Sequence, residues 1–171
     1  MKKFLLVLVI LAVIGGAAFA YEPLGYSPAV DGGSFLLDFG AAAYWNLGDI
    51  RIPPLFIIGE YAIKAIPLSV GGLAAFFMYG GSDWKEYDII VSGRANWHFG
   101  FNVSWLDFYA GFDLGAKIIL YRDSDPLHDS TYAKFSPGGQ VGAHFYFTRV
   151  FGLDVEIGIP WILKLGLAFK F

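Results

Sequence analysis

The charged residues of this chain fall on alternate positions along several segments, and this pattern constrains the fold more than any other feature. In the segment 87–99 the odd positions are apolar or small, whereas the even positions carry polar residues such as Asp88 and Arg94. Successive side chains of a β-strand point to opposite faces, so a period of two predicts strands with one polar and one apolar face. In every predicted strand that carries charges, these share one parity; they are Asp38, Glu60, Lys64, Asp88, Arg94, Asp107, Asp113, Lys117, Asp154, Glu156, Lys164 and Lys170.

Eight such segments follow one another along the chain. Turn-forming or polar residues separate them, and the segment 68–79 has no charge that would fix which of its positions share a face. We therefore predict eight strands, at 33–45, 55–65, 68–79, 87–99, 105–121, 135–148, 152–159 and 162–171.

Membrane-spanning helices are excluded in this part of the chain by length. The longest uncharged stretch after the first twenty residues is 65–82, which has eighteen residues and contains Pro67 and the pair Gly71-Gly72. A spanning helix needs about 20 apolar residues, and proline and glycine are unfavourable in its interior. Any contact with lipid must therefore be made by strands.

The composition favours a closed barrel in lipid over a soluble sheet protein. Hydrophobic residues make up 56% of the chain and charged residues 16%, which is well below the roughly 25% of soluble domains. A chain of this length has no second layer to cover eight apolar strand faces, whereas in a bilayer these faces turn outward and closure leaves no unpaired edge. We predict an all-β fold: a transmembrane, antiparallel, up-and-down β-barrel of eight strands. The net charge of −3 argues against a nucleic-acid partner.

The first twenty residues have the pattern of a secretory signal peptide. Lys2 and Lys3 precede the apolar run 4–14, and Ala18 and Ala20 frame a small-x-small cleavage site. Eleven apolar residues are too few to span a bilayer. We expect residues 1–20 to be removed and 21–171 to form one barrel domain.

The links between the predicted strands alternate in length. The links at 46–54, 80–86 and 122–134 are long or polar and are expected on the outside, whereas the last link, Pro160-Trp161, is very short. All five tryptophans lie near strand ends, where their amphipathic rings suit the headgroup level of a bilayer.

The carboxy-terminal segment resembles the assembly signal of bacterial outer-membrane proteins, and two internal stretches, 108–115 and 138–156, resemble the small eight-stranded outer-membrane β-barrel superfamily with its OmpA-, OmpX- and OmpW-type members. This resemblance implies residence in the bacterial outer membrane, with lipid, the barrel-assembly machinery and periplasmic chaperones as partners. The residues of the signal alternate up to the last residue: Leu163, Leu165, Leu167, Phe169 and Phe171.

The predicted lumen contains the twelve charges together with His98 and His144. Mixed charges in a barrel of eight strands favour a salt-bridged plug, because the interior is just wide enough for side chains to fill it. The alternative is a constricted polar conduit or a small-ligand pocket, with room left by small inward residues such as Gly111 and Gly142. The two histidines lack partners at ligand spacing, so we expect hydrogen-bonded fillers and neither a metal site nor a cofactor.

The link 122–134 carries two weaker motifs. His128 and Ser130 form a His-x-Ser pair that resembles that of outer-membrane lipid A deacylases, but the pair lies in a predicted loop. Asp123, Asp125 and Asp129 could bind calcium, although the loop lacks the central glycine and closing glutamate of an EF-hand. An acidic solvated loop is the preferred interpretation, and no catalytic residue is expected.

Two functions remain open at this stage. The favoured one is a narrow porin-like channel, or a barrel that binds and passes a small molecule. The alternative is a structural or surface-interaction barrel, adhesin-like, with a plugged lumen. A lipid-modifying enzyme is a remote third.

Overall fold

A computed structural model describes residues 29–44, 50–101 and 103–171. The expected signal peptide and its cleavage site at Ala18 and Ala20 lie outside these residues. No helix in the described part of the chain is long and apolar enough to cross a membrane. Eight strands account for most of it: β1 (Phe35–Tyr44), β2 (Ile50–Ala62), β3 (Leu68–Gly80), β4 (Trp84–Phe99), β5 (Leu106–Asp123), β6 (Ser130–Tyr146), β7 (Phe151–Ile159) and β8 (Trp161–Lys170).

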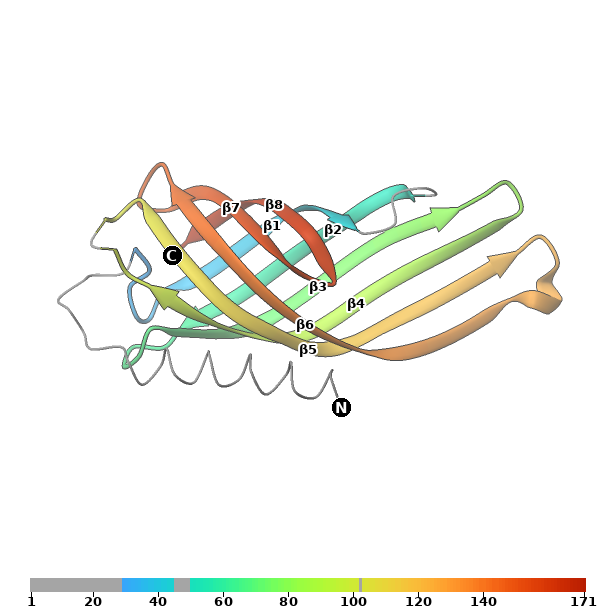
Figure 1. Ribbon diagram of the computed structural model, residues 1–171, viewed down its shortest axis with the longest axis horizontal. Helices are drawn as coiled ribbons and strands as arrows, with labels where there is room; N and C mark the ends of the chain where they lie inside the picture. The colour runs from blue at the N-terminus through green and yellow to red at the C-terminus, as the bar shows by residue number, and fades with distance from the viewer. Residues whose placement is uncertain (1–28, 45–49, 102) are drawn as a thin grey trace.

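The strands form one closed antiparallel barrel in which each strand pairs with its neighbours in the sequence. The barrel closes between β1 and β8, in a register that runs from Leu36 opposite Lys170 to Tyr44 opposite Trp161. Both ends of the barrel domain and the β2–β3, β4–β5 and β6–β7 turns lie at one end of the molecule (Figure 1). The predicted up-and-down barrel of eight strands is confirmed.

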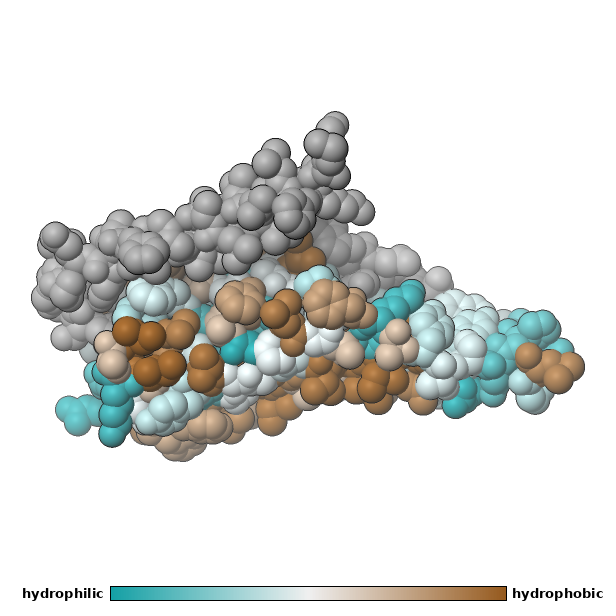
Figure 2. All heavy atoms as spheres, turned by 90° about the horizontal axis from the view of Figure 1, so that it is seen from below, coloured by the Kyte–Doolittle hydropathy of each residue, from teal (hydrophilic) through white to brown (hydrophobic). Residues whose placement is uncertain are grey.

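The outer wall of the barrel is apolar on all eight strands. Leucine, isoleucine, valine and phenylalanine side chains alternate outward along each strand, so that a band of exposed apolar residues surrounds the molecule, part of which is visible in Figure 2. Such a surface is stable in lipid but not in water. It includes Phe39, Leu55, Ile57, Phe76, Val91, Phe112, Leu114, Val141, Ile157 and Leu165.

The barrel wall is much taller on one side than on the other. β7 and β8 have 9 and 10 residues, whereas β4, β5 and β6 have 16, 18 and 17. Pairing between β6 and β7 ends where Gly139 meets Ile159, but β5 and β6 continue to pair with each other up to Tyr121 and Ser130. We call the part of the β5–β6 hairpin beyond that level, residues 113–138, the protruding hairpin; it extends to the far right of Figure 1 beside the β3–β4 hairpin.

Two strands begin five residues earlier than the sequence predicts, whereas the other starts differ by three residues or fewer. β6 begins at Ser130 and not at 135, so the expected loop 122–134 is mostly strand, and only 124–129 connects β5 to β6. β2 begins at Ile50 and not at 55 because the strand accommodates Pro53 and Pro54 where its register with β3 shifts. Proline is tolerated at such irregularities because no ladder hydrogen bond is required there.

Candidate functional site

Arg94 lies at the centre of the charged network that fills the lumen at the level of mid-β4. Its side chain, 1% exposed, contacts carboxylates from three other strands: Nε lies 2.7 Å from Glu60, Nη2 bonds Glu156, and Nη1 lies 3.8 Å from Asp113. Lys164 approaches Glu156 from β8 at 2.5 Å. Buried charges are tolerated only when they are paired in this way, so the network joins β2, β4, β5, β7 and β8 into one cross-barrel cluster.

A second set of contacts fills the lumen nearer the turn-bearing end. Asp107 accepts from both histidines, with Oδ2 2.8 Å from His98 Nδ1 and 3.0 Å from His144 Nδ1. The second ring nitrogen of His144 is directed at two more carboxylates, and this Nε2 atom lies 3.6 Å from Asp38 and 3.7 Å from Asp154. The two histidines are therefore embedded among buried acids.

Ser69, His98 and Asp107 lie in the order of a hydrolase triad, which the sequence analysis did not anticipate. His98 Nε2 is 2.9 Å from Ser69 Oγ, and its Nδ1 is 2.8 Å from Asp107. However, the Ser69 hydroxyl donates its only proton to Glu60, which also accepts a 2.7 Å hydrogen bond from Asn96 and forms an ion pair with Arg94. A serine whose proton is directed to a glutamate and not to the histidine is not activated as a nucleophile, so this arrangement is part of the structural network.

The inward glycines make room for neighbouring side chains and not for a ligand. A Cβ atom at Gly142 would lie 2.4 Å from the hydroxyl of Tyr109, and that hydroxyl donates to Asp154 at 2.6 Å and to Glu156 at 3.1 Å. At Gly111 the space is taken by Asn96, whose Oδ1 would lie 2.1 Å from an added Cβ. The expectation that these positions leave space for water or a ligand is therefore wrong.

The remaining predicted lumen charges lie towards the two ends of the barrel. Asp88 and Lys117 form a 2.5 Å ion pair near the end that bears the β3–β4 and β5–β6 hairpins, which we call the outer end because these links are expected on the outside. At the opposite end, the Lys170 ammonium donates to the carbonyl of Ala29 and lies 4.7 Å from the centre of the Tyr146 ring.

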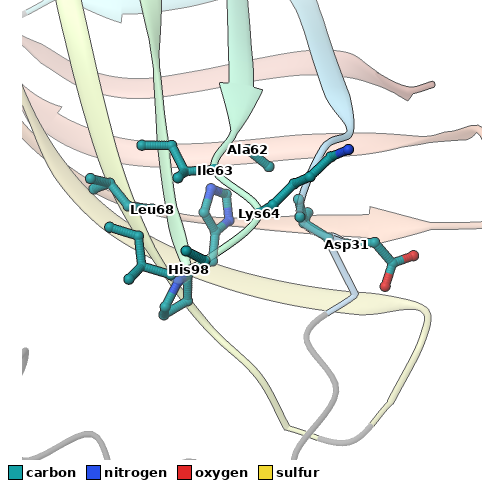
Figure 3. Close-up of a pocket in the computed structure, with 11 residues that line it drawn as sticks. Asp31, Ala62, Ile63, Lys64, Leu68 and His98 are labelled. Carbon is teal, nitrogen blue, oxygen red and sulfur yellow. The ribbon is translucent and has the colours of Figure 1, made fainter.

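Lys64, which we predicted inside the barrel, lies instead on an exposed rim just after the end of β2. There it borders a pocket of about 290 Å³ at the mouth of the barrel, lined also by Asp31, Leu68 and the His98 ring. Its ammonium extends away from the His98 ring (Figure 3). The strand ends before position 64, so the alternation that placed Lys64 inward no longer applies.

Apart from the Asp88–Lys117 pair, the outer half of the lumen is apolar, which corrects the expectation of a polar interior throughout. Phe77 is fully buried, and its ring packs edge-on against Tyr79 and Trp161 at centroid distances of 5.3 and 5.7 Å. Trp161 is 2% exposed, so it does not serve as a headgroup anchor. We call this cluster the apolar plug; it comprises Ala42, Phe56, Ile58, Leu73, Ala75, Phe77, Tyr79, Ile90 and Trp161.

The tip of the protruding hairpin is a tightly bonded turn. A short 3₁₀ turn covers Pro126–His128, and the Asp125 carboxylate caps it by accepting from the Leu127 N–H at 3.1 Å. Asp123 and Asp129 likewise accept backbone N–H groups, from Asp125 and Asp123 respectively. The N–H donated by Asp125 holds the pKa of the Asp123 carboxyl below its usual range.

These contacts account for the acids of the tip without a cation. Among the described residues, no group of three or more His, Cys, Asp or Glu side chains could hold a metal ion. His128 approaches Asp125 at 3.5 Å, while Asp129 approaches Arg122 at 3.7 Å. The carboxylate of Asp129 is thus held by Arg122 and a backbone N–H, so the three aspartates act as turn caps.

The terminal residues of the chain lie along β8. Phe169 stacks on Phe39 of β1 at 5.7 Å, and the backbone of Phe171 exchanges two hydrogen bonds with Phe35. The segment is therefore part of the seam that closes the barrel. The expected role of Leu163, Leu165, Leu167, Phe169 and Phe171 as an assembly signal remains a prediction.

An apolar outer band, a charged lumen and complete closure define the class: this is a transmembrane antiparallel β-barrel of eight strands. The sequence itself matches no protein-family model and no curated protein. Solved structures are similar in fold. The N-terminal barrel of Pseudomonas aeruginosa OprF matches with a TM-score of 0.60 at 16% identity, covering 82% of this chain and 98% of that one.

Two further barrels give comparable matches. P. aeruginosa OprG aligns with a TM-score of 0.59 at 12% identity, over 85% of this chain and 99% of its own. Ail, the attachment invasion locus protein of Yersinia pestis, aligns with a TM-score of 0.56 at 14% identity, over 82% of this chain and 99% of its own. The shared feature is the eight-stranded barrel.

Proposed function

We propose that this protein is a surface-interaction barrel of the bacterial outer membrane, with a closed lumen and with its partner bound outside by the taller side of the wall. The observation that carries the proposal is the combination of a filled interior with a sheet that extends beyond it. The charged network occupies the inner half of the lumen and the apolar plug the outer half.

The filled lumen argues against the porin-like channel that the sequence favoured. Ions would have to pass both the Arg94 cluster and the rings of Phe77 and Trp161, which are 0% and 2% exposed. Rearranging a buried ion-pair network costs several kcal/mol, and an apolar constriction excludes water. A small-molecule conduit has the same obstacle.

The taller side of the wall provides a preorganised surface. The β3–β4 and β5–β6 hairpins are tied together where the Ser124 N–H donates to the Asp83 carbonyl at 2.8 Å. A rigid surface loses little conformational entropy on binding, which favours affinity. The attachment function in the name of Ail is consistent with such a role.

The charge of this surface indicates which partners it fits. The outer ends of the two hairpins carry five acids, Asp83, Glu86, Asp123, Asp125 and Asp129, against the two bases Lys85 and Arg122. Ail has been crystallised with a heparin analogue. An acidic surface repels such sulfated polymers, so we propose a protein partner.

Two measurements test the proposal together. In planar bilayers the folded wild type is expected to carry no current. The Phe77→Ala, Trp161→Ala double variant has a wider outer constriction and is expected to conduct ions. Cells displaying the wild type are expected to adhere to at least one immobilised serum or extracellular-matrix protein. Replacing 119–132 by Asn-Gly, which joins the paired residues Ile118 and Ala133, should remove this adherence.

Steady conductance by the folded wild type, or undiminished adherence after the hairpin is shortened, would contradict the proposal. Folding of every variant is checked by the heat-dependent shift of its electrophoretic mobility.

A further inference from the structure

The outer part of β6 has a free edge. Residues 130–138 pair with β5 on one side, but β7 ends at Ile159 opposite Gly139, and no described strand pairs with their other side. From Ser130 to Phe135 every residue is exposed, and Phe135 is 74% exposed. We propose that this edge, residues 131–137, binds an extended segment of a partner protein by β-strand addition, with one carboxylate of that segment beside Lys134. This inference rests on the surface-interaction function proposed above.

The hydrogen bonds at the other end of β6 show which backbone groups are free. The Tyr146 N–H donates to Trp105, next to β5, and the Phe147 N–H donates to Phe151 of β7. In an antiparallel strand the N–H and C=O of one residue point to the same side, and successive residues alternate. The register of β6 with β5 has no shift, so even residues bond β5, and Thr131, Ala133 and Phe135 direct their backbone groups to the open side.

The position of Pro137 fits this assignment. As an odd residue it directs its backbone to the open side, where its missing N–H breaks no bond with β5. It is also the first free position above the end of β7. An unpaired N–H in lipid is costly, so the absence of a donor is favourable at the position nearest the bilayer. The free donors begin above it, at Phe135.

The free edge lies at and beyond the outer boundary of the apolar band. The nine residues of β7 rise roughly 21 Å, at about 3.3 Å per residue and a tilt of about 45°. The apolar band of such barrels is about 25 Å tall. The band therefore ends only slightly above Ile159, and Thr131 and Ala133 stand in water.

The charge beside the edge selects the chemistry of the occupant. Lys134 lies on the inner face directly opposite Lys117 of β5, and its ammonium lies 5.0 Å from the Tyr132 ring. Lys117 is neutralised by Asp88, whereas Lys134 has no carboxylate within ion-pair distance in the described part of the chain. A docking strand with a carboxylate at this level supplies one, and apolar residues on its other face pack beside Phe135.

A second copy of the chain in the same membrane does not fit this edge. Two copies are related by a rotation about the membrane normal, so their tilted β6 strands cross instead of lying side by side, and a continuous ladder cannot form. An extended segment of a separate protein has no such restriction. Strand addition of this kind draws affinity from main-chain hydrogen bonds and specificity from alternate side chains.

The test uses the folded protein in detergent micelles and a synthetic peptide of seven residues in which valine and threonine alternate and a single glutamate stands at the central position. Ala133→Pro removes one free-edge N–H and leaves the β5 ladder intact, whereas the matched control Ala133→Thr keeps the N–H. We expect wild type and Ala133→Thr to bind the peptide alike, and Ala133→Pro to bind about tenfold more weakly or not at all. A peptide N-methylated on its docking edge should not bind.

Amide hydrogen exchange of the wild type gives a readout that requires no variant. The N–H groups of Thr131, Ala133 and Phe135 should exchange fast in the free protein and slow down when the peptide is bound, while their even neighbours stay protected throughout. Failure of the wild type to bind, equal binding by Ala133→Pro, or equal binding of the N-methylated peptide would overturn the inference.

The outcome is distinguishable from failure of the proposed function. If Ala133→Pro cells retain the adherence that shortening of the hairpin abolishes, the surface function stands and the free edge is not its site. If shortening itself has no effect on adherence, the surface function fails.

Discussion

Removal of the Arg94 side chain is the most direct test of the charged network. Arg94 is the cation shared by Glu60, Glu156 and Asp113, with 1% of its side chain exposed. An Arg94→Met variant keeps the apolar stem but leaves these carboxylates with one fewer counter-charge. Breaking a buried pair from one side costs about 3–5 kcal/mol, which lowers the folding equilibrium constant roughly a hundred- to several-thousand-fold.

The assay is reversible urea unfolding of the protein in lipid vesicles, followed by tryptophan fluorescence. Adding Glu60→Gln to Arg94→Met should restore part of the lost free energy, because it removes one of the uncompensated charges. The exposed Lys85→Met serves as the matched control and should change the free energy of unfolding by less than about 0.5 kcal/mol. A loss below about 1 kcal/mol for Arg94→Met would refute the conclusion that the network holds the lumen together.

Three further outcomes follow from the described contacts. Gly142→Ala forces the Tyr109 ring aside and should lower the free energy of unfolding by about 1–3 kcal/mol. Gly139→Ala is the control, because the nearest atom to its added Cβ is 3.9 Å away, and equal losses for the two variants would contradict the clash. Phe112→Arg, on the lipid face, should cost about 2–4 kcal/mol in vesicles, and a neutral result would exclude Phe112 from the apolar band. The lowered pKa of Asp123 means that the native tip favours the ionised carboxylate. The stability that this carboxylate adds to the tip is therefore present above the ordinary pKa near 3.8 and is lost as the pH falls through the lower native pKa. Amide hydrogens at the tip should exchange faster in acid, and unchanged exchange would argue against the cap.

The barrel could be predicted from sequence because lipid imposes a strict rule on each strand. Where β4 and β5 cross the bilayer, a charge such as Arg94 or Asp107 must point into the lumen. The odd or even position of a residue relative to such a charge therefore shows whether its side chain faces the lumen or the lipid. Above the bilayer both faces meet water and the rule lapses. The start of β6 at Ser130 was therefore missed, since the residues from Ser130 to Lys134 show no apolar alternation.

The apolar plug was missed for a related reason. Phe77 lies on β3, a strand without charges, so nothing in its sequence marked the inward parity. Phe56 and Ile58 share the parity of Glu60 on β2, and the outward residues between them are equally apolar. An apolar inward face is indistinguishable by pattern from an apolar outward one.

The pairings inside the charged network were also beyond prediction. Arg94 and Glu156 are 62 positions apart in the chain, and they meet only because the closed wall brings β4 and β7 to opposite sides of one narrow lumen. Parity placed both side chains inside the barrel. It contains no information about which acid faces which base across the interior.

The shortness of β7 and β8 also affects the surrounding lipid. Beside this hairpin the wall rises roughly 21 Å, less than the apolar band of about 25 Å that is typical of such barrels, so acyl chains there must shorten or tilt to keep contact with Ile159. Each ångström of such mismatch costs a fraction of a kcal/mol. Lipids around the barrel are therefore compressed on one flank only, and this flank is where a neighbouring membrane protein with an equally low wall would relieve the most strain.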